Sequence, residues 1–173
     1  MEAKSKEPDR KKNGAALLVE HASNPRHKNE ESVQEDADVA MPGGSPECGG
    51  SVVVYLKGGD DGKIERLSWT GQGDTISMGA TSIVVERILG EGLSMEEVLG
   101  LDYEEFIDSL GRELIGSRTR HATLGLSTIK GAVRIYQRKS RSEDKERTRS
   151  LGSVFAGAFV GACRHRRDAL VHL

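Results

Sequence analysis

Ser51 to Lys57 is a run of β-branched and aromatic residues, which predicts a β-strand whose side chains alternate between two faces, with Val53 and Tyr55 on one of them. The Gly- and Asp-rich run from Gly58 to Gly62 predicts a turn, because these residues adopt turn conformations at little cost. Lys63–Thr70 then predicts the returning strand of a hairpin. The residues that share one face within their strand are Val52, Val54 and Leu56 in the first, and Leu67 and Trp69 in the second.

A helical period replaces this alternation after Gly73. Apolar residues recur every three or four positions, as the buried stripe of a helix requires. Asp74 stands where an N-cap residue would stand, and Gly90 stands where such a helix would end. The stripe consists of Ile76, Ala80, Ile83, Val84 and Ile88.

The same rules predict four more helices, at residues 15–22, 95–99, 103–110 and 119–137. Asn24-Pro25 ends the first of them, and Ser94 with Glu97 forms a capping-box pair at the start of the second. Residues 26–46 are polar and contain Pro and Gly, so we expect a loop there.

The order of helix, hairpin and several helices predicts an α+β fold, in which helices pack on one face of an antiparallel sheet. At 173 residues the chain has room for one compact domain with tails. We expect a disordered arm at residues 1–14, a folded domain at 15–138, and a charged linker at 139–173 that continues as either a helix or a tail.

Charge and composition narrow the classes of partner. The net charge is −2 and aromatic residues make up 4% of the chain, so we expect no nucleic-acid partner. The two cysteines are far apart, which argues against a disulfide framework and for a reducing cytoplasm. The charged N-terminus lacks the pattern of a secretory signal, and the apolar run from Leu151 to Cys163 is too short to span a bilayer. We therefore expect a cytoplasmic protein without a membrane segment.

Three metal-binding side-chain types occur at distant points of the chain: Cys48, then Asp74 after 26 residues, then His121 after another 47. A thiolate, a carboxylate and an imidazole suit Zn²⁺ or Fe²⁺, and three protein ligands leave one coordination position open. Each residue also has a simpler interpretation that the pattern leaves open. Asp74 could serve only as a helix cap, His121 could be merely exposed, and Cys48 could be an idle thiol.

Four short elements resemble the NifU/IscU/SufU family of iron–sulfur cluster scaffolds, in order and with family-like spacing over residues 15–137. Glu20–Arg26 (EHASNPR) looks like the opening DHYENPRN element of that family. Pro46–Gly50 (PECGG) resembles P-x-C-G-D, which carries the first cluster cysteine. Trp69–Met78 (WTGQGDTISM) is similar to F-x-G-x-G-C-S-I-S-M, which carries the second. Arg118–Leu124 (RTRHATL) is similar to R-I-K-C-A-T-L, which carries the third.

The resemblance implies a three-stranded antiparallel sheet with helices packed on one face and the ligands gathered at one end. It also implies a non-enzymatic assembly scaffold that binds iron, zinc or a labile iron–sulfur cluster. Cys48, Asp74 and His121 would be its ligands, and Cys48 would accept sulfur. The implied partners are a cysteine desulfurase and apo iron–sulfur proteins, and a homodimer stays open.

The chain departs from the family pattern at the ligand positions themselves. Asp74 and His121 occupy the second and third cysteine positions, and Gly50 replaces an aspartate of the family. Both cysteine replacements exchange one metal-binding group for another, which favours a retained site. Residues 115–119 do not reproduce the L-P-P-V-K segment that engages a chaperone in the IscU branch, and the SufU insertion before the third cysteine is absent.

Two alternative functions remain at this level. One is a degenerate family member that acts as a metal-binding regulator of the desulfurase without building clusters. The other is a metal-dependent hydrolase, for which Glu47 is the nearby candidate base. His21 is expected to pack the first helix, and Cys163, His165 and His172 are expected not to form a site.

Overall fold

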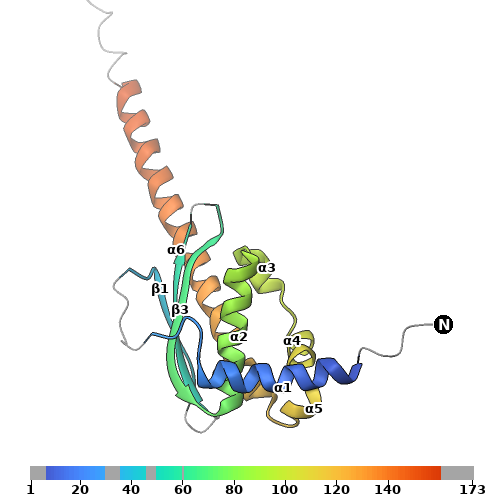
Figure 1. Ribbon diagram of the computed structural model, residues 1–173. Coiled ribbons are helices and arrows are strands. Elements are labelled where there is room, and N and C mark those ends of the chain that lie inside the picture. Colours follow the sequence, from blue (N-terminus) through green and yellow to red (C-terminus); the bar gives the residue numbers. More distant parts are fainter. Residues whose placement is uncertain (1–6, 30–35, 46–49, 60, 161–173) are drawn as a thin grey trace, which may run out of the picture. The chain divides into compact units, whose positions relative to one another are not determined.

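The computed structural model describes residues 7–29, 36–45, 50–59 and 61–160 (Figure 1). It divides into two compact units, Met1–Tyr136 and Gln137–Leu173. The elements in chain order are α1 (Glu7–Ser23), β1 (Val39–Ser45), β2 (Gly50–Gly58), β3 (Ile64–Gly73), α2 (Thr75–Glu91), α3 (Met95–Gly100), α4 (Tyr103–Leu110), α5 (Arg112–Ile115) and α6 (Thr119–Val160). Among the described residues, no helix is long and apolar enough to cross a membrane.

The three strands form one antiparallel sheet in the order β1-β2-β3, which confirms the predicted fold class. The predicted β2–β3 hairpin is present, with Val54 opposite Trp69 and Leu56 opposite Leu67. All four of these side chains are at most 1% exposed, so this face of the sheet lies in the core. In Figure 1, α2 lies alongside β3, and α4 and α5 lie farther from the sheet.

Strand β1 corrects the prediction of an uninterrupted loop at residues 26–46. Val39–Ser45 pairs along its whole length with β2, and Pro42 lies opposite Val53. Pro42 has no backbone N–H to donate to a neighbouring strand, but β1 is an edge strand, where proline is tolerated. Pro and Gly in residues 39–45 are typical of loops, so the sequence alone does not indicate this strand, which is defined by its pairing with β2.

The cap of α2 at Asp74 is confirmed, while its C-terminal end is not where the sequence placed it. The helix continues through Gly90 and ends at Gly92, whose φ of 62° is the left-handed conformation that glycine adopts most readily. The capping box of Ser94 and Glu97 is present at the start of α3, and α4 has the predicted bounds. The end at Gly92 is a local capping structure, in which the N–H of Gly92 donates to the carbonyl of Leu89 and the N–H of Leu93 donates to the carbonyl of Ile88.

Helices α1 and α6 are longer than their apolar periods indicate. α1 begins at Glu7 rather than Ala15, and α6 continues to Val160 rather than ending near Gln137. Residues 138–149 are mostly Arg, Lys, Glu and Ser without Gly or Pro, and the charged residues among them are good helix formers. A solvent-exposed helix needs no apolar stripe, so a charged helical segment such as this one has the same composition as a charged linker.

Close packing of the helices in the first unit depends on two glycines. A Cβ at Gly79 of α2 would clash with the backbone carbonyl of Leu18 in α1. A Cβ at Gly125 of α6 would lie 2.8 Å from the Cα of Thr81 in α2. These helices approach one another at positions without side chains, which fixes where α6 begins relative to α2.

Candidate functional site

The candidate site lies where β3 gives way to α2 and where α6 begins. Asp74 follows Gly73, the last residue of β3, and has extended backbone angles of φ −76° and ψ 171°. Its side-chain Oδ1 accepts a hydrogen bond of 2.7 Å from the backbone N–H of Ser77. Asp74 therefore caps α2, and the cap holds the carboxylate in one orientation.

The second oxygen of the same carboxylate binds His121. Asp74 Oδ2 lies 2.7 Å from Nδ1 of the His121 ring, although 47 residues separate the two in the chain. The two side chains are 33% and 24% exposed, so the pair is open to solvent on one side. The structure thus brings together two of the three residues predicted to form the site.

The electrostatics of the pair keep the Asp74 carboxyl ionised. Partial burial by itself raises the pKa of this carboxyl, but the hydrogen bonds from the Ser77 backbone and from His121 outweigh it. The net result is a pKa below the ordinary value of 3.8. An ionised carboxylate can only accept hydrogen bonds, so the proton between Asp74 and His121 belongs to Nδ1 of the ring.

Cys48, the third predicted residue, lies outside the described residues, as do Glu47, Cys163, His165 and His172. The described residues contain no group of three His, Cys, Asp or Glu side chains placed to hold a metal ion. Gly50, two positions after Cys48 in the sequence, pairs with Gly73 across β2 and β3. The first described residue after Cys48 therefore lies beside the residue that precedes Asp74.

Position 50 has no room for a side chain. A Cβ at Gly50 would lie 2.8 Å from the carbonyl oxygen of Gln72, 2.9 Å from the Cα of Gly73 and 3.1 Å from Oγ of Ser77. Two of these neighbours are backbone atoms of β3, which can yield only if the strands separate. The aspartate that the family resemblance places here could not be accommodated without moving β2 or β3.

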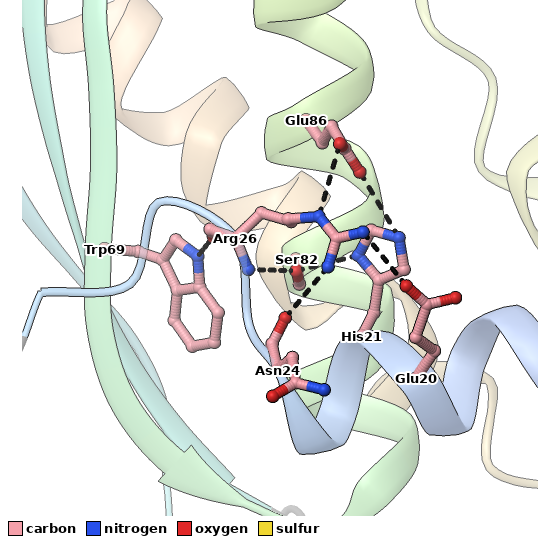
Figure 2. A network of polar contacts seen from close by, with 7 residues as sticks. All are labelled: Glu20, His21, Asn24, Arg26, Trp69, Ser82 and Glu86. Carbon is pink, nitrogen blue, oxygen red and sulfur yellow. Dashed lines mark hydrogen bonds and ion pairs between the residues drawn. The ribbon is translucent and has the colours of Figure 1, made fainter.

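A second polar cluster surrounds His21 in the first unit (Figure 2). The backbone N–H of Arg26 donates to Oγ of Ser82 at 2.7 Å, and that Oγ lies 2.8 Å from Nδ1 of His21. Nε2 of His21 lies 3.3 Å from a carboxylate oxygen of Glu86. The indole N–H of Trp69 donates to the carbonyl of Arg26 at 3.0 Å. The cluster joins α1, the segment after it, α2 and β3.

The hydrogen-bonded order of Ser82, His21 and Glu86 is that of a hydrolytic triad, but a substrate could not reach the serine. Ser82 is 0% exposed and His21 is 2% exposed. The hydroxyl oxygen also accepts the Arg26 N–H, which fixes it away from any substrate. His21 thus packs the first helix, as expected from the sequence, and the cluster serves to hold residues 24–29 against the domain.

Sequence inspection did not single out Ser82, Glu86 or the steric role of Gly50. Ser82 and Glu86 are four residues apart on α2, which places them on one helix face toward His21. That spacing was visible in the sequence, but the choice of partner depends on how α1 crosses α2. In the sequence, Gly50 is visible only as a replacement of the family's aspartate, and its tight surroundings appear only in the folded sheet.

The fold and the site define an α+β protein with a carboxylate–imidazole pair at one end of a three-stranded sheet. The family model described as NifU-like N terminal domain matches residues 15–143, so the chain belongs to this family. That confirms the family resemblance found in the sequence.

Curated relatives are similar over part of the chain. An iron–sulfur cluster assembly scaffold protein IscU of Thermotoga maritima is 33% identical over 96 residues, which are 56% of this chain and 65% of that protein. An IscU scaffold of Streptococcus pyogenes serotype M1 is 31% identical over 86 residues, which are 50% of each chain. The chain thus spans less than two thirds of the length of these two relatives.

Solved structures of low sequence identity share the fold. A NifU-like protein (N-terminal) from Brucella abortus superimposes with a TM-score of 0.58 at 16% identity, covering 73% of this chain and 97% of that one. A putative iron–sulfur cluster assembly scaffold protein for the SUF system from Fervidobacterium islandicum gives a TM-score of 0.53 at 21% identity, covering 68% and 93%.

Proposed function

We propose that this chain is a non-enzymatic scaffold in iron–sulfur cluster assembly, and that it works in the cytoplasm. Its family membership and its relatives named as IscU scaffolds support the general role. The observation that carries the proposal is the Asp74–His121 pair. Both residues stand at positions where the family resemblance places cysteines, and their side chains meet at 2.7 Å.

The proposed site comprises Cys48, Asp74 and His121. Gly50 supports the inclusion of Cys48, because two residues of chain span about 7 Å at most and Gly50 pairs with the neighbour of Asp74. All three side-chain types occur at iron and zinc sites, the carboxylate either as a ligand or as the hydrogen-bond partner of a ligating histidine. The metal or cluster would be cargo, held at this end of the sheet before transfer.

Sulfur would enter at Cys48. The thiolate of Cys48 attacks the outer sulfur of a persulfide on a cysteine desulfurase, a new S–S bond forms on Cys48, and the desulfurase thiolate leaves. This exchange needs no external oxidant or reductant, because one S–S bond replaces another. Release of that sulfur as sulfide would take two electrons from a separate thiol reductant.

The donor count limits what one chain can hold. A [2Fe–2S] cluster normally takes four protein ligands, whereas this chain offers three candidates and only one thiolate among them. One chain therefore suits a single iron or zinc ion, and a cluster would need ligands from a second copy or a thiol cofactor. Apo iron–sulfur proteins would be the acceptors.

Anaerobic reconstitution with ferrous iron and sulfide tests this function. The full chain should develop visible sulfur-to-iron charge-transfer absorption, and Cys48→Ala should lose it. Ser45→Ala serves as the matched control, because it changes a residue just before the same segment without removing a thiol. A colourless wild-type product, together with no transfer of sulfur from a desulfurase persulfide to Cys48, would refute the scaffold function.

The alternative is a metal-binding regulator that occupies the desulfurase without building clusters. Replacement of two of three cluster cysteines favours it. It predicts stoichiometric zinc or iron by elemental analysis, inhibition of desulfurase turnover by the added chain, and no cluster transfer to an apo-ferredoxin. Transfer of an intact cluster in that assay would exclude the regulator.

A further inference from the structure

We infer that Asp74 is a positioning residue that holds His121 as its Nδ1–H tautomer, so that Nε2 is the atom that binds the metal. This inference rests on the proposed function, since it concerns the same site. It assigns different roles to two residues that sequence treats as equivalent ligands. Asp74 would act through His121 rather than bind the metal itself.

Both oxygens of the Asp74 carboxylate already have partners. Oδ1 accepts the backbone N–H of Ser77 at 2.7 Å, and Oδ2 meets Nδ1 of His121 at 2.7 Å. A metal bound directly to either oxygen would compete with the helix cap or with the imidazole. The cap and the ring take one lone-pair position on each oxygen, so a metal could bind the carboxylate only by sharing an oxygen with one of these two partners.

The His121 ring has one nitrogen committed and one available for coordination. Nδ1 faces an ionised carboxylate and must carry a proton there, which leaves the lone pair of the neutral ring on Nε2. A carboxylate that accepts the second N–H of a ligating histidine fixes the ring and makes the other nitrogen a better donor. The Asp74–His121 pair is arranged in this way.

Both members of the pair are held by secondary structure. Asp74 is fixed as the N-cap of α2, and the backbone N–H of His121 donates to the carbonyl of Arg118 at 3.1 Å in the first turn of α6. Neither side chain depends on a loop for its position. The geometry is thus set before any ion arrives, which is what a pre-organised donor requires.

The ring of His21 can be compared with that of His121 in the same protein, because its surroundings favour the opposite tautomer. Its Nε2 faces the carboxylate of Glu86, and its Nδ1 faces the hydroxyl of Ser82. The neutral His21 ring should therefore carry its proton on Nε2, where His121 carries it on Nδ1. One spectrum of one sample can distinguish the two rings.

Asp74→Ser isolates the positioning role from the capping role. Serine is as good an N-cap as aspartate, so α2 keeps its start, but the shorter side chain cannot cap α2 and bind His121 together. Asp74→Ala removes both functions and serves to show the cost of losing the cap. His121→Gln removes the donor nitrogen and keeps a side chain of similar polarity.

Long-range ¹H–¹⁵N NMR of the metal-free full chain at mildly alkaline pH tests the tautomers. We expect His121 as Nδ1–H and His21 as Nε2–H in the wild type. In Asp74→Ser, His121 should shift toward Nε2–H while His21 does not change. A wild-type His121 that carries its proton on Nε2 would overturn the inference without any metal being present.

Titration with Co²⁺, a spectroscopic substitute for Zn²⁺, tests the ligand role. Asp74→Ser should weaken Co²⁺ binding by about 10- to 100-fold and keep imidazole coordination, and His121→Gln should lose the imidazole signal. Unchanged affinity in Asp74→Ser, or absorption-edge data that show a carboxylate ligand supplied by Asp74, would overturn the inference. If these results hold but Cys48 neither accepts sulfur nor supports a cluster, the scaffold function fails while the roles of Asp74 and His121 stand.

Discussion

Gly50 lies opposite Gly73 across β2 and β3, so close that a Cβ at position 50 would lie 2.9 Å from the Cα of Gly73. The carbonyl oxygen of Gln72 would be 2.8 Å away on the same side. This pair of glycines lets the strand that follows Cys48 reach the residue before Asp74. Sheet pairing at this end thus depends on a position that cannot carry the family's aspartate.

Restoring a side chain at Gly50 should therefore destabilise the domain. We expect Gly50→Ala to lower the free energy of unfolding by about 1–3 kcal/mol, and Gly50→Asp by more, because backbone atoms of β3 must move. Urea denaturation followed by circular dichroism measures the change. Gly90→Ala is the matched control: no atom lies within 4 Å of its added Cβ, and alanine in a helix should stabilise slightly. Equal stability of Gly50→Ala and wild type would contradict the packing argument.

Ser82→Ala should be among the more damaging single-atom deletions in the chain. Ser82 is 0% exposed, and its loss would leave both the Arg26 N–H and Nδ1 of His21 without a partner. We expect a loss of about 2–4 kcal/mol in the free energy of unfolding, because each buried unsatisfied group costs about 1–3 kcal/mol. Ser127→Ala removes a hydroxyl that donates to the carbonyl of Leu124 in the same helix and should change stability by less than about 0.5 kcal/mol. A similar effect of both substitutions would show that the buried network contributes little.

Stability should fall as the pH drops below the ordinary pKa of histidine, through His21. Burial lowers its pKa below 6.5 despite the opposing charge of Glu86, with a smaller lowering effect of Arg26 and an opposing effect of Glu20. As the pH falls, His21 of the unfolded chain is protonated before His21 of the folded chain. The contribution of His21 to the free energy of unfolding is therefore complete above pH 6.5, and it is lost as the pH falls through the lower pKa of the folded state. Thermal unfolding at a series of pH values should show a decline in wild type that is reduced in His21→Gln. Parallel pH profiles for the two proteins would exclude His21 as the origin.

Removing the helical residues after Arg141 should leave the first unit folded. Among the residues whose burial the structure describes, Val133 is the last buried apolar side chain, and the first compact unit ends at Tyr136. We expect a chain that ends at Arg141 to unfold within about 1 kcal/mol of the full chain, because no core side chain is lost. Tyr136→Ala in the full chain provides the comparison, since Tyr136 packs against the core and its truncation should cost more. A large loss of stability on shortening would show that the domain extends beyond the predicted boundary at 138.

Local sequence determined the elements whose signals are short-range. The alternation from Ser51 to Lys57, the Gly-rich turn and the following strand gave the hairpin, and Asp74 gave the start of α2. Capping depends on residues three apart, and alternation depends on residues two apart, so neither needs a distant partner. The order of these elements was enough to predict the α+β class.

Long-range contacts decided the remainder. Residues 39–45 form the strand β1 because their backbone pairs with β2, a segment further along the chain. The meeting of Asp74 with His121 required α6 to begin beside the start of α2, which the close approach of Gly125 to Thr81 permits. The sequence by itself identified the candidate ligands. Only the packing of helices and sheet shows that the Asp74 carboxylate serves both as a helix cap and as the partner of the His121 ring. The reason is that the distance between two side chains far apart in the chain is a property of the folded state.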